Sequence, residues 1–203
     1  RSRGLGDVYK RQVVNGGLTP PGGLDNFNSG FLPAAYQGSV FKPQTAPVAN
    51  ISRKEKDINH QKRKMDLLSR LDQKVLKKTG GQDAIESAIK NYEMAFRMQT
   101  SVPEVMDISN EPNSIFEMYG EDSRKPGTFA ANCLLARRLI EKDVRFVQLY
   151  HQGWDHHGDL PKNIKVQCKE TDQPTAALIK DLKQRGLLED TLVISVSYTH
   201  LTL

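Results

Sequence analysis

Apolar residues recur every three or four positions in several stretches of the chain, and this spacing places them on one face of a helix. The pattern predicts helices over residues 52–78, 82–99 and 128–141. A shorter helix should run from Asp107-Ile108-Ser109 to Tyr119, after a break at Val102-Pro103. A last helix should begin near Pro161, be interrupted between Asp172 and Pro174, and end at Gly186, because proline disrupts helices and glycine terminates them.

Two short apolar runs, Val144–Tyr150 and Thr191–Ile194, predict β-strands. From residue 128 onward the predicted order is helix, strand, loop, helix, strand. This order implies parallel strands joined by a right-handed crossover, and therefore an α/β fold.

Composition divides the rest of the chain. Residues 13–51 are rich in Gly, Pro, Asn and Ser, with an aromatic residue every few positions. They predict a long loop that is either disordered or pinned to a surface as a lid or substrate wall. Residues 52–100 are expected to form a helical hairpin and residues 101–194 the α/β part. Residues 1–12 and 195–203 are expected to be spurious or disordered tails on an internal fragment.

The chain of 203 residues is polar, with a mean hydropathy of −0.56 and a net charge of +5. It contains no apolar run of membrane-spanning length. Between Arg53 and Lys78, ten Lys/Arg face four Asp/Glu. Leucines interleave with these charges and no stacking aromatics accompany them, which favours a solvated helix face over a nucleic-acid site. Cys133 falls on an apolar helix face and should be a buried thiol.

The candidate chemistry lies in residues 151–159, which follow the first predicted strand and hold three of the five histidines. Asp155 and His157, two residues apart, can converge on one divalent cation. His156 should point elsewhere, and Asp159 should cap the next helix. The alternative is a hydrogen-bonded loop without a metal. His151 could face the site, and Trp154 could shield it or stack on a sugar-like ligand.

Several motifs in order resemble the bacterial family called domain of unknown function 1501, which belongs with the sulfatase-like and alkaline-phosphatase-like proteins. The resemblance spans about Val14 to Ile194. The motifs are Ser29–Gly38, Asp107–Pro112, Phe146–Leu149, Gly153–His157, Thr171–Leu178 and Asp181–Ile194.

The resemblance implies a doubly wound, alkaline-phosphatase-like sheet with a metal site at the strand ends. It implies a truncated, sulfatase-like metal-dependent hydrolase of phosphate or sulfate esters, on a small molecule or glycan. Zinc, calcium or manganese would be the cofactor, and the protein would be periplasmic or secreted. The family's Trp-Asp-x-His pattern matches Asp155 and His157 as metal ligands. Four further residues would support the ligands or form a substrate wall: His151, Trp154, His156 and Asp172.

The chain also departs from the family pattern. The family's last strand continues into Glu-Phe-Gly-Arg-Thr, whereas unrelated sequence begins at Ser195. The superfamily's first strand, with its Asp ligand and nucleophile, would precede residue 13. The fragment itself is therefore expected to be inactive. The alternative function is a non-catalytic exported binding or scaffold protein on the same fold, because a fold alone does not carry an activity.

Overall fold

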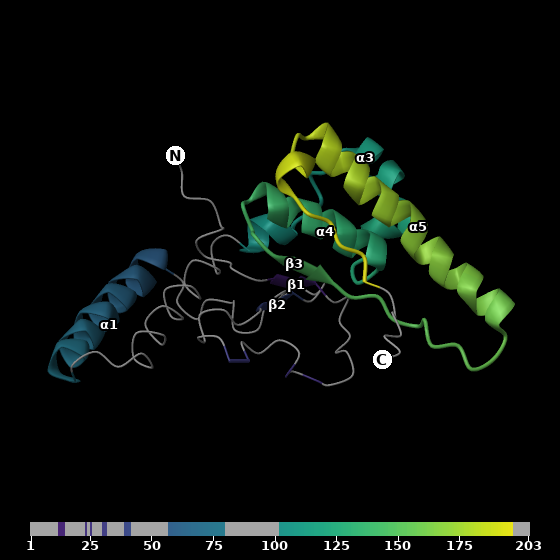
Figure 1. Cartoon of the computed structure of the whole chain (residues 1–203). Helices are drawn as coiled ribbons and strands as arrows, with labels where there is room; N and C mark the ends of the chain where they lie inside the picture. The colour runs from purple at the N-terminus through teal and green to yellow at the C-terminus, as the bar shows by residue number, and fades with distance from the viewer. Residues whose placement is uncertain are drawn as a thin grey trace.

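The computed structural model describes residues 12–14, 23, 25, 30–31, 39–41, 57–79 and 102–196 (Figure 1). The described residues leave out most of the predicted tails and loop, at 1–12, 195–203 and 13–51. They also leave out the predicted helix 82–99, so the expected helical hairpin lies outside them. Residues 102–106 are helical. The other elements are β1 (Gln12–Val14), β2 (Ser39–Phe41), α1 (Ile58–Thr79), α3 (Asn113–Tyr119), η4 (Glu121–Arg124), α4 (Phe129–Glu141), β3 (Val147–Leu149), α5 (Leu160–Gln184) and η5 (Leu188–Asp190).

The described strands form a parallel sheet in the order β2-β1-β3. Val13 of β1 lies opposite Val40 of β2 on one side and opposite Gln148 of β3 on the other. Residues 12–14 and 39–41 thus form short strands within stretches for which the sequence predicts a tail and a long loop. Three-residue strands carry no readable period, and parallel pairing joins distant segments. A doubly wound sheet stays a prediction.

The predicted strand Val144–Tyr150 is confirmed only over Val147–Leu149, which form β3, and Thr191–Ile194 is not a strand in the described structure. Thr191 is extended, yet Leu192 is 84% and Ile194 70% exposed. A strand requires hydrogen-bonded pairing with a neighbour. The sequence pattern reports apolarity alone and cannot say whether a neighbouring strand lies within reach.

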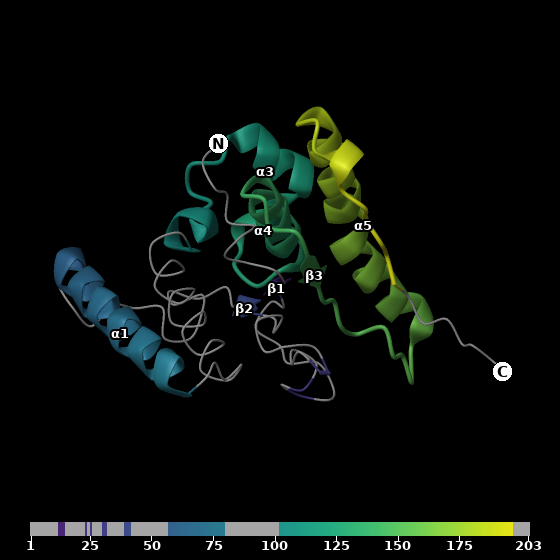
Figure 2. The same cartoon turned by 60° about the vertical axis from the view of Figure 1, so that its left-hand side comes forward.

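Helix α4 is the centre of the packing, between the sheet and α5 (Figures 1 and 2). Thr128 caps its first turn, because Ala131 N donates to Thr128 Oγ1 at 3.2 Å. Leu135 and Leu139 pack with Val102 and Val105, whereas the opposite side of α4 packs against α3 and α5. The helix is thus buried on several sides, and burial raises the pKa of the Cys133 thiol to about 12.

Proline does not act as the sequence predicts. Val102-Pro103 lies within a helical turn, where the Pro103 carbonyl accepts from Asp107 N at 3.1 Å. Proline fits a first turn because the amide it lacks has no partner there. Helix α5 is continuous, so the predicted interruption at Asp172–Pro174 is wrong. Pro174 is itself buried, and Ala177, Leu178 and Leu182 are buried in the following turns, so that packing of this half of the helix offsets the hydrogen bond that proline removes.

The end of α5 follows the prediction. Gly186 adopts φ +68°, a left-handed conformation that side chains disfavour. Leu187 N donates to Leu182 O at 2.9 Å and Gly186 N to Lys183 O at 3.1 Å. This pair of bonds is a Schellman motif, which satisfies the last carbonyls of the helix.

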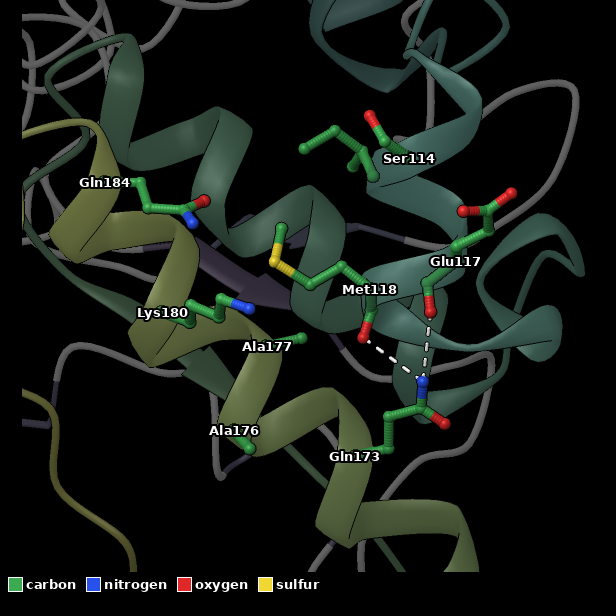
Figure 3. A pocket seen from close by; sticks show the side chains of 9 residues that line it. Ser114, Glu117, Met118, Gln173, Ala176, Ala177, Lys180 and Gln184 are labelled. Atoms are coloured by element: carbon green, nitrogen blue, oxygen red, sulfur yellow. Dashed lines mark hydrogen bonds between the residues drawn. The ribbon is translucent and has the colours of Figure 1, made fainter.

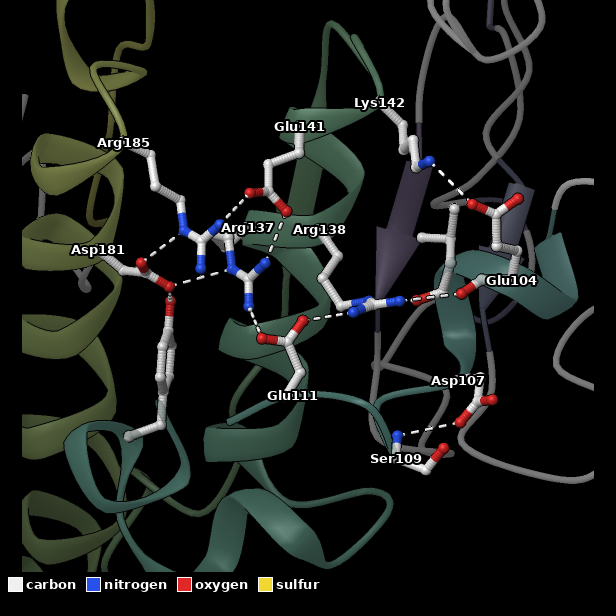
Figure 4. A network of polar contacts seen from close by, with 12 residues as sticks. Glu104, Asp107, Ser109, Glu111, Arg137, Arg138, Glu141, Lys142, Asp181 and Arg185 are labelled. Carbon is white, nitrogen blue, oxygen red and sulfur yellow. Dashed lines mark hydrogen bonds and ion pairs between the residues drawn. The ribbon is translucent and has the colours of Figure 1, made fainter. Parts of the chain in front are cut away.

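A buried ion network around Arg137 links α4 to its neighbours (Figure 4). Arg137 is 1% exposed, and its guanidinium lies 2.7 Å from Glu111, 2.6 Å from Glu141 and 3.0 Å from Asp181. Tyr119 OH donates to Asp181 Oδ2 at 3.2 Å. Four segments, namely the turn before α3, α3, α4 and α5, therefore meet at one cation.

The network controls the charge of its carboxylates. Burial acts to raise the pKa of Glu111, but hydrogen bonds from Arg137 and Arg138 outweigh it and lower that pKa. Burial and the adjacent Asp181 carboxylate raise the pKa of Tyr119, so its hydroxyl stays a donor. Each buried charge is thus compensated by a partner, as the low-dielectric interior requires.

We predict that Arg137→Met lowers the free energy of unfolding by about 3–5 kcal/mol, because Glu111 and Asp181 lose their buried cation. Urea unfolding followed by circular dichroism measures this change. Arg63→Met, at an exposed position of α1, is the matched control and should cost under about 0.5 kcal/mol. Similar losses for both variants would contradict a special role for Arg137.

We predict that the stability supplied by Glu111 is lost in acid. Its folded pKa is lowered below the usual value of 4.5. The folded state therefore binds the Glu111 proton less tightly than the unfolded state, and the contribution is fully present above pH 4.5 and falls below it. The stability difference between the wild type and Glu111→Gln should shrink as the pH drops through this window. A difference that is constant with pH would refute the assignment.

Candidate functional site

The loop that follows β3 leads directly into α5 and carries the histidines. Asp159 is the residue before α5, as predicted, but its side chain makes no capping hydrogen bond. Its carbonyl accepts from Lys162 N at 3.1 Å and Asn163 N at 3.0 Å. The reason is its left-handed backbone, φ +48° and ψ +44°, because a side-chain cap requires extended backbone at this position.

Gly153 holds the loop close to α5. Its φ is +92°, and a Cβ at this position would lie 2.8 Å from Gln167 Nε2. The backbone conformation therefore favours glycine, whereas the side-chain amide of Gln167 could shift to admit a Cβ. Gly153 thus brings the loop next to the Gln167 side chain of α5, a neighbour that the loop sequence does not reveal.

The structure brings the two predicted ligands together. His157 Nε2 lies 2.9 Å from Asp155 Oδ2, and the two side chains are 85% and 79% exposed. A carboxylate and an imidazole in contact, open to solvent, can bind a divalent cation or simply share a proton. Among the residues that the structure describes, no group of three or more His, Cys, Asp or Glu is placed to hold a metal.

His151 is the anchored histidine of the loop. Trp154 Nε1 lies 2.9 Å from His151 Nδ1, and Glu170 Oε2 lies 3.1 Å from His151 Nε2. The indole N–H can only donate, so Nδ1 must accept and Nε2 carries the proton that faces Glu170. Phe129 packs against the edge of the His151 ring, with the ring centroids 5.2 Å apart. Both nitrogens of His151 are thus engaged, and the residue positions the loop.

Sequence reasoning missed Glu170 and Phe129 as partners of this loop. Both lie in helices, at positions that carry no local signal of a role here. His156 is half-buried between exposed neighbours, and its buried Nε2 forms no hydrogen bond. Its predicted turn away from the Asp155–His157 pair stays a prediction. Asp172 is exposed on α5, roughly 18 Å along the helix from its start at 1.5 Å per residue. The structure therefore does not bring Asp172 to the pair.

A concave surface that the sequence does not predict lies between α3 and α5 (Figure 3). This open groove has a volume of about 570 Å³, and Ile115, Met118, Ala177 and Lys180 are among the residues that line it. The side chain of Gln173 reaches from α5 to α3, where its Nε2 donates to Glu117 O at 3.1 Å and to Met118 O at 3.3 Å. These bonds satisfy the last carbonyls of α3. Gln173 of α5 thus caps the end of α3 and joins the two helices that form the groove.

The comparisons with known proteins give one family match. The family model described as "Protein of unknown function (DUF1501)" matches residues 9–197. No curated protein and no solved structure matches the chain.

We predict that neutral His151 carries its proton on Nε2, and that Trp154→Phe keeps the ring contact but removes the donor to Nδ1. The loss of this bond should cost about 1 kcal/mol and move the Nδ1 resonance of His151. Long-range ¹H–¹⁵N correlation spectra measure the tautomer, and His60 on α1 is the internal control. A wild-type His151 protonated on Nδ1 would exclude the proposed arrangement.

Proposed function

Because the chain belongs to the DUF1501 family, we propose that it forms part of a sulfatase-like, metal-dependent hydrolase that acts on a phosphate or sulfate ester. The observation that carries the proposal is the Asp155–His157 contact, 2.9 Å long and exposed to solvent. It lies just past β3, which pairs in parallel with β1. Loops at the carboxyl ends of parallel strands are the usual place for ligand sites in α/β proteins.

The chemistry of the pair fits a divalent cation. A cation between Asp155 and His157 would bind one carboxylate oxygen and one imidazole nitrogen. This mixed donor set suits zinc or manganese better than calcium, which prefers oxygen ligands alone. A metal bound here would polarise the ester and activate a water molecule. A complete site needs at least one further protein ligand, and the exposure of the pair leaves room for it.

The other residues of the loop would position this pair and the substrate. His151, held by Trp154 and Glu170, fixes the first part of the loop. The exposed face of Trp154 offers a wall on which the organic part of an ester, such as a sugar ring, can pack. Ligand rigidity of this kind favours metal binding, because less conformational entropy is lost.

Three further proposals rest on the family alone. The sheet would be doubly wound, as in alkaline phosphatase, the substrate would be a small-molecule or glycan ester, and the protein would be periplasmic or secreted. The competing function is a non-catalytic exported binding or scaffold protein on the same fold.

We predict that the chain binds Zn²⁺ or Mn²⁺ and that Asp155→Asn and His157→Gln each weaken the affinity at least about tenfold, because each removes one ligand. Isothermal titration calorimetry with the metal salts measures this. Hydrolysis of para-nitrophenyl phosphate and sulfate by a full-length family member, with and without a chelator, measures the associated activity.

The matched controls are Asp66→Asn and His60→Gln, which remove the same groups from exposed positions of α1. They should leave metal affinity unchanged. Metal binding that is insensitive to both loop substitutions would overturn the ligand assignment. Metal binding without hydrolysis of either ester by that full-length family member would favour the non-catalytic function.

A further inference from the structure

Helix α1 exposes a leucine ridge formed by Leu67, Leu68 and Leu71. Their exposed fractions are 57%, 39% and 49%. Leu67 and Leu71 are one turn apart, so the three side chains cover one continuous strip of the helix. Met65 and Leu76, which are partly buried, lie roughly opposite Leu67 on the helix, and Leu68 borders that buried side. Three large apolar side chains in one exposed strip are unusual on a protein surface and indicate a binding function.

Basic residues border this ridge. Arg63 lies one turn before Leu67, Arg70 lies three residues after Leu67, and Lys74 lies three residues after Leu71. All three basic side chains are exposed. At 100° per residue they fall on the side of the helix next to Leu67. Helix α1 holds seven Lys/Arg and two Asp, Asp66 and Asp72. The ridge therefore faces its partner with a strong excess of positive charge.

Helix α1 also stands apart from the other described helices. In both views it lies to one side of the body formed by α3, α4 and α5 (Figures 1 and 2). Among the described elements, it makes no extensive contact with another helix or strand. Its exposed strip is thus accessible to a large, flat partner.

We propose that α1 binds the surface of an anionic lipid bilayer. The leucine ridge would enter the boundary between headgroups and acyl chains, and the bordering Arg and Lys would contact the anionic headgroups. This is binding in the plane of the membrane, since none of the described helices is long and apolar enough to cross one.

The charge pattern and the ridge together favour this partner over two others. Nucleic acid would use the positive charge but leaves an apolar ridge exposed, and α1 carries no aromatic residue for stacking on bases. A second copy of the chain would cover the leucines but bring two strongly basic helices together, which like charges oppose. An anionic bilayer satisfies both features of α1.

The test is flotation of the full chain with vesicles of phosphatidylcholine alone or of equal parts phosphatidylcholine and phosphatidylglycerol. We expect binding to the anionic vesicles and at least about tenfold less to the neutral ones. Raising NaCl from about 0.05 M to about 0.5 M should weaken it. Leu67→Gln/Leu71→Gln should reduce binding at least about tenfold while preserving helix content, because glutamine is a good helix former.

Charge-matched variants locate the surface. Arg63→Gln/Arg70→Gln/Lys74→Gln should abolish most binding, whereas Lys162→Gln/Lys165→Gln/Lys169→Gln, at exposed positions of α5, should preserve it. Circular dichroism confirms that each variant is folded. Equal losses from the two triple variants, no vesicle binding, tighter binding to duplex DNA than to anionic vesicles, or dimerisation through the leucines would each overturn the proposal.

Discussion

The buried guanidinium of Arg137 is the interaction on which the described body depends. A cation withdrawn from water is stable only if its charge is compensated, and here carboxylates from three different segments, Glu111, Glu141 and Asp181, supply that compensation. The same carboxylates also bind Arg138 and Arg185. Moving any one of these segments away removes part of the compensation for a buried charge, which opposes the movement. The network thus specifies how α4 and α5 pack, in addition to the apolar contacts around it.

This arrangement also fixes the place of the candidate site. His151 lies between Phe129, the first residue of α4, and Glu170 on α5. Its position therefore depends on the relative placement of the two helices that Arg137 joins. Gly153, with its positive φ, lies next to the side chain of Gln167 on α5. The loop is held by the contacts of His151 where it leaves β3 and is exposed at the Asp155–His157 pair, an arrangement suited to ligands that are preorganised yet open to solvent.

The proposed metal site and the proposed membrane-binding face of α1 would bind their ligands by different interactions. The Asp155–His157 pair would act by donor chemistry at one point, whereas α1 would act by an apolar ridge with surrounding charge spread along a helix. They lie on different elements, and α1 makes no extensive contact with the other described elements. A hydrolase with a membrane-facing helix would be held close to esters at a bilayer surface, which joins the two proposals in one functional picture.

The sequence by itself determined the local features. These features depend on residues within a few positions of one another. They are helix α4 with its Thr128 cap, the end of α5 at Gly186, the strand β3 and the contact of Asp155 with His157. Only the tertiary structure decided the rest. These features depend on segments far apart in the chain. They are the continuation of α5 through Pro174, the pairing of β1 with β2 and β3, the exposure of the apolar run 191–194 and the partners of Arg137. Turns and helix caps are stabilised by residues close together in the sequence, so the local pattern predicts them. The burial of a charge and the pairing of a strand instead depend on which distant segments the fold brings within hydrogen-bonding distance.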